Sequence, residues 1–167
     1  MESPTKSSCI PQSEIPKVFE NNFETSFEQE ACGYKPLLYK ISVSLGLAQK
    51  ESSELVTYVC QAECKNYAYQ NKNFTPKVWL SKALVRHCVL KINSVMFSQK
   101  ENSSQTSLIP FYISKIPFSF RLAYILLQSF EFTETEVAQI LNLTPMQVRE
   151  RLSKAMAIVK SYHCKQA

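Results

Sequence analysis

The sequence predicts an all-α protein built from two small helical domains. Apolar residues recur at helical spacing along most of the chain, only 2 of its 167 residues are glycine, and helix-start signals precede several apolar runs. A hydrophobic content of 45% is typical of globular chains that bury a core. We expect the domains at residues 28–97 and 113–163, with a flexible linker at 98–112.

The amino-terminal domain is predicted to hold three helices. Residues 1–27 are polar, contain three prolines and show no period, which indicates a flexible tail. A first helix is expected at 28–44, ending before Gly46. A second follows to Tyr69, with Ser52 or Ser53 as its cap. A third covers 78–97, and the serine-rich stretch "SQKENSSQTS" after it has the composition of a flexible connection.

After an amphipathic helix at 118–130, the stretch "TETEVAQILNLTPMQVRERLSKAMAIVK" predicts a helix-turn-helix. One face of its first helix carries apolar residues at helical spacing: Val137, Ala138, Ile140 and Leu141. The pattern breaks at Asn142. Thr144 then suits a cap, Pro145 the first helical position, and Gln147 completes a capping box.

The second of these helices has two distinct faces. An apolar stripe faces the preceding helices: Val148, Leu152, Ala155 and Val159. The opposite face carries Met146, Glu150, Ser153 and Ala157. Residues 145–160 contain four cations and one carboxylate, which suits a helix in the DNA major groove, with cations on phosphates and central side chains on base edges. This segment alone does not exclude the alternative, a solvated basic face on an ordinary helix pair.

Composition argues against catalysis and metal binding. All 14 acidic residues are Glu and the chain has 2 His, so most triad, acid/base and metal-hydrolase schemes lack their parts, and we expect no enzyme. Cys60, Cys64 and the His87-Cys88 pair could form a zinc set. No Cys-x-x-Cys pair is present, however, so we expect buried thiols, with no metal and no cofactor.

No signal peptide and no apolar run of membrane-spanning length is found, so we expect a cytoplasmic protein whose cysteines are reduced. The predicted DNA-binding helix implies that the protein is also nucleoid-associated. The net charge of +5 favours an anionic partner only weakly.

Taken together, residues 27–160 resemble the bacterial alternative sigma factors of the extracytoplasmic-function class, within the sigma-70 family. The family's carboxyl-terminal pattern of E-I/V-A-x-x-L, a turn and V-K/R-x-R-L-x-R/K-A is matched by Glu136-Val137-Ala138, Leu141, Val148-Arg149, Arg151-Leu152 and Lys154-Ala155. In the amino-terminal half, "SSELV" resembles the family's E-D-L-V-Q, and "FTPKVWLSKALVRHCVLKI" resembles F-x-x-W-L-x-x-I-x-x-N.

The chain departs from this family at several positions. Arg86 stands where Asn is usual, and Thr57 and Tyr58 replace Gln and Glu. Residues 156–158, Met-Ala-Ile, stand where relatives usually continue with Arg and Lys. Fewer cations mean fewer phosphate contacts, and therefore weaker and less salt-sensitive intrinsic DNA binding.

The resemblance implies a transcription-initiation factor that binds core RNA polymerase and directs it to specific promoters, with a region 2-like domain before the linker and a region 4-like domain after it. The implied partners are the clamp helices of the largest polymerase subunit, the flap of the second-largest subunit, promoter DNA, and an anti-sigma factor or a DNA-targeting recruiting factor. All chemistry would occur on the polymerase.

Three sets of site residues follow from this resemblance and the helix faces. The polymerase set is Glu54, Thr57, Tyr58 and Gln61. The set for the unpaired strand at the downstream promoter element is Lys72, Asn73, Phe74, Lys77, Lys82 and Arg86. The set for the upstream element is Met146, Gln147, Arg149, Glu150, Arg151, Ser153 and Lys154, in which Arg151 and Lys154 are the phosphate clamps.

Two alternatives remain open. A degenerate sigma-like adaptor would recruit polymerase while a separate factor supplies DNA targeting, as the missing cations suggest. A free-standing helix-turn-helix regulator would use its amino-terminal domain only to dimerise. Co-purification with core polymerase separates the regulator from the others, and transcription from a bare promoter separates the adaptor.

The linker generates a first prediction. Limited proteolysis should cut first within residues 98–112, because exposed serine-rich backbone is a preferred nicking site. The measurement is the mass of the first two fragments. A full-length chain that resists cleavage there would contradict a flexible linker.

Overall fold

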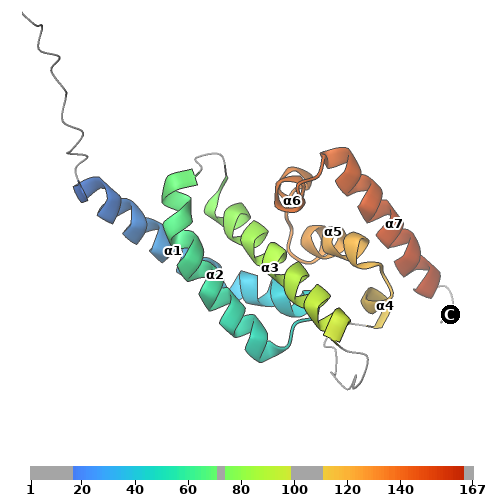
Figure 1. The fold of residues 1–167 in the computed structure, drawn as a ribbon. Coiled ribbons are helices and arrows are strands. Elements are labelled where there is room, and N and C mark those ends of the chain that lie inside the picture. Colours follow the sequence, from blue (N-terminus) through green and yellow to red (C-terminus); the bar gives the residue numbers. More distant parts are fainter. Residues whose placement is uncertain (1–16, 71–73, 99–110, 164–167) are drawn as a thin grey trace, which may run out of the picture.

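The computed structural model describes residues 17–70, 74–98 and 111–163, and every regular element in these ranges is an α-helix, as predicted. The amino-terminal half contains α1 (Lys17–Leu45), α2 (Gln49–Gln70) and α3 (Pro76–Ser98). The carboxyl-terminal half contains α4 (Phe111–Ser114), α5 (Phe118–Gln128), α6 (Glu134–Leu141) and α7 (Pro145–His163) (Figure 1). Within these ranges no helix combines the length and the apolar character needed to cross a membrane.

The start of α1 differs from the predicted boundary between tail and first helix. It begins at Lys17, so residues 17–27, which we placed in the flexible tail, are helical. The three prolines of residues 1–27 all lie at or before Pro16, outside the helix. Phenylalanine recurs every fourth residue at 19, 23 and 27, which is a helical spacing. Phe27 itself is buried. Of the predicted linker, residues 99–110 lie outside the described residues, and the short α4 was not predicted.

The three long helices of the amino-terminal half pack on one another. The large, fully buried side chains of α1 fall on one helical face: Leu38, Ile41 and Leu45. Gly46 ends this helix with a φ of 109°, a conformation that glycine adopts without a Cβ penalty. The next amide, of Leu47, donates to the Ser42 carbonyl at 3.2 Å, so the chain turns directly into α2.

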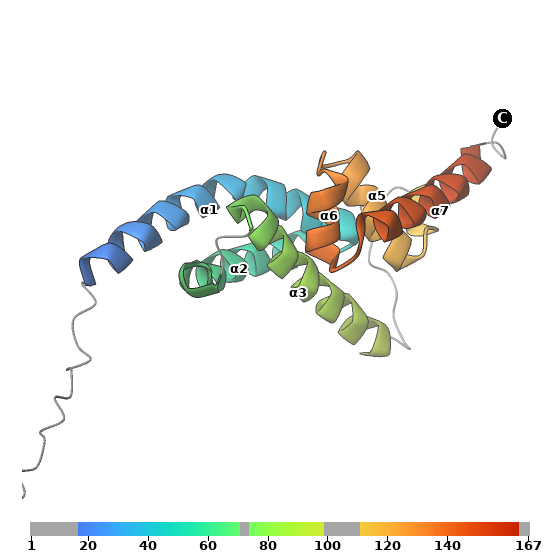
Figure 2. The same cartoon turned by 90° about the horizontal axis from the view of Figure 1, so that it is seen from above.

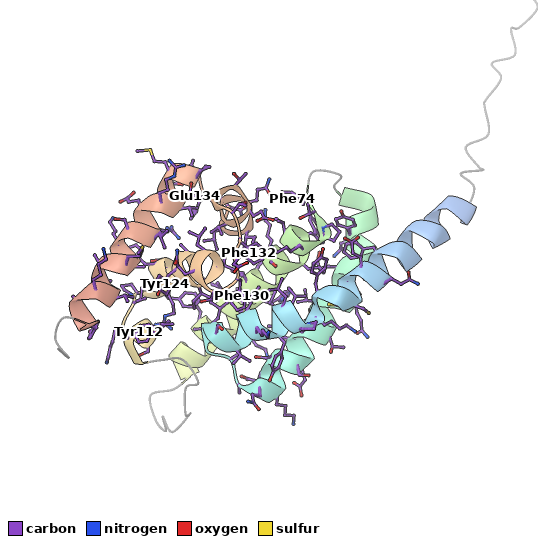
Figure 3. All side chains as sticks on the ribbon, turned by 180° about the vertical axis from the view of Figure 1, so that it is seen from behind. Phe74, Tyr112, Tyr124, Phe130, Phe132 and Glu134 are labelled. Carbon is purple, nitrogen blue, oxygen red and sulfur yellow. The ribbon has the colours of Figure 1, made fainter. Side chains whose placement is uncertain are left out.

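The two halves share one hydrophobic core. Helix α3 packs against α6, and α1 packs against α5. Phe132, in the loop before α6, is 3% exposed, and the Lys77 ammonium lies 4.1 Å from the centre of its ring. Figure 3 places Phe132 between the halves, and in Figures 1 and 2 α7 lies on the side of the molecule away from α2. The outer face of α7 is therefore free of the amino-terminal half.

The cysteines confirm the predicted burial. Cys60, Cys64 and Cys88 are buried, whereas Cys32 on α1 is exposed. Burial raises the pKa of the Cys88 thiol to about 12 and also raises the pKa of Cys60. A thiol that is both buried and protonated at neutral pH is a poor nucleophile.

We therefore predict selective thiol labelling. Iodoacetamide at pH 8 should modify Cys32 in the native protein, while Cys60 and Cys88 should react only after unfolding in urea. The measurement is peptide mass spectrometry over a time course, with the urea-unfolded chain as the control in which all three react. Equal native rates at Cys32 and Cys88 would contradict the buried assignment.

Candidate nucleic-acid and polymerase interfaces

The first helix of the helix-turn-helix is fixed at both ends. Thr133 Oγ1 accepts from the Glu136 amide at 3.2 Å, and Glu136 Oε2 accepts from the Thr133 amide at 2.8 Å, so a capping box starts α6. The helix ends at Asn142, whose φ of 52° and ψ of 50° are left-handed. Asn tolerates this conformation better than most residues, which explains why the helical pattern breaks there.

The second helix starts with the predicted capping box. Thr144 Oγ1 accepts from the Gln147 amide at 3.2 Å, and Gln147 Oε1 accepts from the Thr144 amide at 2.9 Å. Together with the turn at Asn142, these bonds fix the direction in which α7 leaves α6. Gln147 was also a candidate for base contact, but its side-chain oxygen is occupied at the cap.

The two faces of α7 have the burial that the sequence predicts. Val148 and Ala155 are fully buried, and Leu152 and Val159 are half-buried, so the stripe is the inner face. The predicted outer face is exposed: Met146, Glu150, Ser153 and Ala157. Met146, in the first turn, has 81% of its surface exposed. A partner can approach this face without displacing any other part of the described chain.

Two ion pairs hold the charged residues of α7. Arg149 Nε lies 2.6 Å from Oε2 of Glu134, which Figure 3 labels at the start of α6. Lys154 Nζ lies 2.6 Å from Oε1 of Glu150, one turn earlier on the same helix. The hydrogen bond and charge of Lys154 lower the pKa of Glu150, so the Glu150 carboxylate is available as an acceptor at neutral pH. Exposed pairs like these are weak and exchange readily for other partners.

The two phosphate-clamp candidates also contact α5. Arg151 Nη1 donates to the Ser119 carbonyl at 3.5 Å, and Lys154 Nζ lies 5.6 Å from the centre of the Phe120 ring. Ser153 lines a shallow hollow on α7 together with Arg149 and Lys160, among other residues. All the upstream candidates therefore lie on one helix, and several of them already have partners within the chain.

The downstream candidates lie around an aromatic cluster. Phe27 stacks on Tyr67 with ring centres 4.1 Å apart, and Trp79 lies 5.9 Å from Tyr67 and 6.2 Å from Phe74. The Tyr67 hydroxyl donates to the Phe74 carbonyl at 3.0 Å. Phe74 is half-buried here, with the Lys82 ammonium 5.0 Å from its ring centre. The Phe74 ring is thus held by contacts within the protein, and only part of its surface is open for stacking against a base.

The remaining downstream candidates differ in their surroundings. Lys77 contacts Phe132 of the other half, whereas Arg86 is exposed. Lys82 and Arg86 line a small hollow with Trp79, whose buried indole N–H has no hydrogen-bond partner in the described part of the chain. Lys72 and Asn73 lie outside the described residues.

The polymerase candidates form one continuous surface. Glu54, Thr57, Tyr58 and Gln61 are exposed on α2 and line a shallow hollow with Ser53. Tyr58 is 55% exposed, and its ring meets the His87 ring edge-on at 5.5 Å. The Thr57 hydroxyl donates to the Ser53 carbonyl at 3.0 Å.

Sequence reasoning missed two residues that shape these sites. Glu134 pairs with Arg149 across 15 positions of sequence, and only its place in the first turn of α6 could have suggested a nearby cation. Phe132 sits in a short loop with no period, so its burial against α3 had no local signal.

Comparisons with known proteins bear on the fold. No protein-family model matches this chain. No curated protein matches it significantly in sequence either. Among solved structures, it is similar to the sigma factor RpoE in complex with the anti-sigma factor NepR from Bartonella quintana, with a TM-score of 0.69 and 17% identity over 82% of this chain and 96% of that one.

Two further structures share the fold. CnrH in complex with the cytosolic domain of CnrY matches with a TM-score of 0.64 and 13% identity, over 90% of this chain and 97% of that one. The anti-anti-sigma factor PhyR, complexed with NepR from Bartonella quintana, matches with a TM-score of 0.53 and 18% identity, over 77% of this chain and 48% of PhyR. The chain therefore has a sigma-like, all-helical fold.

The turn before α7 generates a prediction. Asn142→Ala should lower the free energy of unfolding by about 1 kcal/mol, because alanine is strained at a left-handed position, whereas Asn142→Gly should be neutral or stabilising. Urea unfolding followed by circular dichroism measures both. Thr135→Ala, at an exposed position in α6, is the control and should change stability by less than about 0.5 kcal/mol. An Asn142→Ala protein as stable as the parent would contradict the turn geometry.

Proposed function

We propose that this chain is a sigma factor of the extracytoplasmic-function class, which binds core RNA polymerase and directs it to specific promoters. The observation that carries the proposal is the helix-turn-helix: both helices start with capping boxes, the second as the sequence predicts, and the second helix presents an exposed polar face on the outside of a sigma-like fold. The sequence motifs of both halves support the same conclusion.

At the upstream element, α7 would enter the major groove. Arg149 would leave Glu134 and donate two hydrogen bonds to guanine, while Glu150 would accept from the cytosine amino group. Once Glu150 turns to a base, Lys154 is released to a phosphate. Met146 would meet a thymine methyl group at the start of the helix. The proposed DNA contacts of Arg149, Glu150 and Lys154 thus replace exposed ion pairs within the chain. The contact of Met146 replaces no ion pair.

At the polymerase, the exposed α2 surface of Glu54, Thr57, Tyr58 and Gln61 would dock on the clamp helices of the largest subunit. Lys82 and Arg86 of α3 would then lie near the unpaired strand, with Phe74 as the adjacent ring. Lys77 would join them when its side chain turns away from Phe132.

A second candidate function has its own observation. The two base-reading charges, on Arg149 and Glu150, are both paired within the chain, and apolar residues stand at 156–158 where relatives carry cations. A sigma-like adaptor would need no base reading, because a separate factor would supply the DNA target. The likeness to PhyR, an anti-anti-sigma factor, shows that this fold also occurs in a protein with another regulatory role.

Substitutions on α7 test the proposal. Arg149→Ala should cost about 1–3 kcal/mol of binding on a cognate site, and Glu150→Ala should relax the preference at its own base pair. Lys154→Ala should instead weaken binding to all sequences and reduce the salt slope by about one. The measurement is selection and affinity on randomised duplex DNA, with and without core polymerase.

Two controls accompany this experiment. Lys40→Ala removes an exposed cation of α1 and should alter neither affinity nor preference. Melting curves should show that all the variants remain folded, because none of these side chains is buried. The adaptor function predicts no preferred sequence for the wild-type chain under either condition, and that result would refute promoter reading by α7.

A further inference from the structure

A hollow of about 130 Å³ lies between α2 and α3, within the amino-terminal half. Its lining combines one residue of α2 with five of α3: Glu63, Trp79, Lys82, Ala83, Arg86 and His87. Sites for drug-sized ligands measure about 300–1,000 Å³, so this hollow is too small for a folded segment or a large organic ligand. It can admit a compact polar group.

Two cations at the hollow have no carboxylate partner. Lys82 and Arg86 are one turn apart on α3, so they lie on the same helix face and repel each other. Among the described residues, no ion pair involves either of them, and Glu63 of α2 is likewise unpaired. The Lys82 ammonium lies 5.0 Å from the centre of the Phe74 ring, which is a weak contact for a partly exposed cation. An anion held by both cations would relieve their repulsion.

The wall of the hollow also contains uncharged donors. Trp79 forms part of it, and the buried indole N–H has no acceptor among the described residues. A buried donor without an acceptor is destabilising. The His87 ring meets the Tyr58 ring edge-on at 5.5 Å, and this contact holds the imidazole beside the hollow. Donors and cations outnumber the single carboxylate of Glu63, so the chemistry of the lining suits an oxyanion.

We propose that this hollow binds a free, phosphate-bearing anion of the size of phosphate or pyrophosphate. The exposed guanidinium of Arg86 would hold two phosphate oxygens, and the Lys82 ammonium would turn from Phe74 to a third. An oxygen seated against the wall would supply the acceptor that the Trp79 indole lacks. Glu63 repels the same anion, which keeps the affinity moderate.

The regulatory consequence of this site rests on the proposed function. Lys82 and Arg86 also belong to the downstream DNA set, so an anion held by both would compete with the unpaired strand. The backbone of that strand carries the same phosphate chemistry. The test therefore compares a free anion with a single-stranded oligonucleotide.

The full-length chain carries its own reporter. Trp79 is the one tryptophan of the sequence, so tryptophan emission reports on the hollow directly. Titration with sodium phosphate, and separately with pyrophosphate, should change this emission along a saturable curve. Sodium chloride at the same ionic strength should give no saturable change. Phosphate and chloride titrations that coincide would overturn the proposal.

Two substitutions locate the anion, and a third is the control. Arg86→Ala should weaken phosphate binding about ten-fold or more, because a charge-assisted contact is lost. Glu63→Gln should instead tighten binding, because it removes a like charge, and a merely structural role of Glu63 would not do so. Lys91→Ala removes a partly exposed cation of α3 outside the hollow and should change the affinity by less than about two-fold, since salt screens charges that make no direct contact. Unchanged affinity in both Arg86→Ala and Glu63→Gln would refute the site.

Ala83→Leu separates the free anion from DNA. Leucine would fill the hollow from α3 and leave every charge in place, and Ala83 belongs to none of the proposed contact sets. The variant, checked for folding by its melting curve, should lose the phosphate response and keep its binding of the oligonucleotide. Beyond the effect of chloride, phosphate should displace the oligonucleotide from the parent only. If Ala83→Leu loses oligonucleotide binding as well, the hollow is part of the DNA surface and the free-anion site is wrong.

The anion site and the proposed function fail separately. If phosphate binds as described but the chain recruits neither polymerase nor promoter DNA, the anion site stands and the sigma function fails. If polymerase and promoter binding are intact and phosphate gives no saturable response, the anion site fails alone.

Discussion

The packing of α3 against α6 is the contact on which the rest of the arrangement depends. Helix α3 carries Lys82 and Arg86, and α6 sets the direction of α7 through the turn at Asn142. Phe132 is buried at this junction, where the Lys77 ammonium covers its ring. A cation above an aromatic face is attracted to the ring, and more strongly when water is excluded. This one junction therefore joins the two halves, and it engages Lys77, a cation that the proposed function assigns to the downstream DNA set.

Intramolecular pairing sets the second constraint. The charges that would read DNA are already satisfied, Arg149 by Glu134 and Glu150 by Lys154. DNA binding must exchange these pairs, and the net gain comes mainly from the counterions released by newly contacted phosphates. Because few cations follow Lys154 on α7, the gain in binding free energy from counterion release would be smaller than for a more basic helix. Under the proposed function, DNA affinity would therefore depend on polymerase holding the chain at the promoter.

Local features of the fold and site were predictable from the sequence. The capping box of Thr144 and Gln147 and the break at Asn142 involve neighbouring residues only, so their signals lie in the sequence itself. The polymerase set lies on one face because its members are spaced one turn apart on a single helix. Burial of Cys60 and Cys64 followed from their place in a helical stripe.

Features that depend on distant contacts were not predictable in this way. The pairing of Glu134 with Arg149 and the burial of Phe132 against α3 arise from packing between helices, and no spacing rule reports them. The start of α1 at Lys17 has only a weak local signal, a phenylalanine at every fourth position of an otherwise polar segment.

The most direct test of the sigma function is in vitro transcription with purified core RNA polymerase and a library of genomic fragments. Polymerase alone should give only background, and adding the chain should give transcripts that start at a small set of fragments sharing an upstream sequence. That set should change when Arg149 is replaced by alanine. Polymerase that binds the chain yet starts at no preferred fragment would contradict promoter direction and leave the adaptor function in its place.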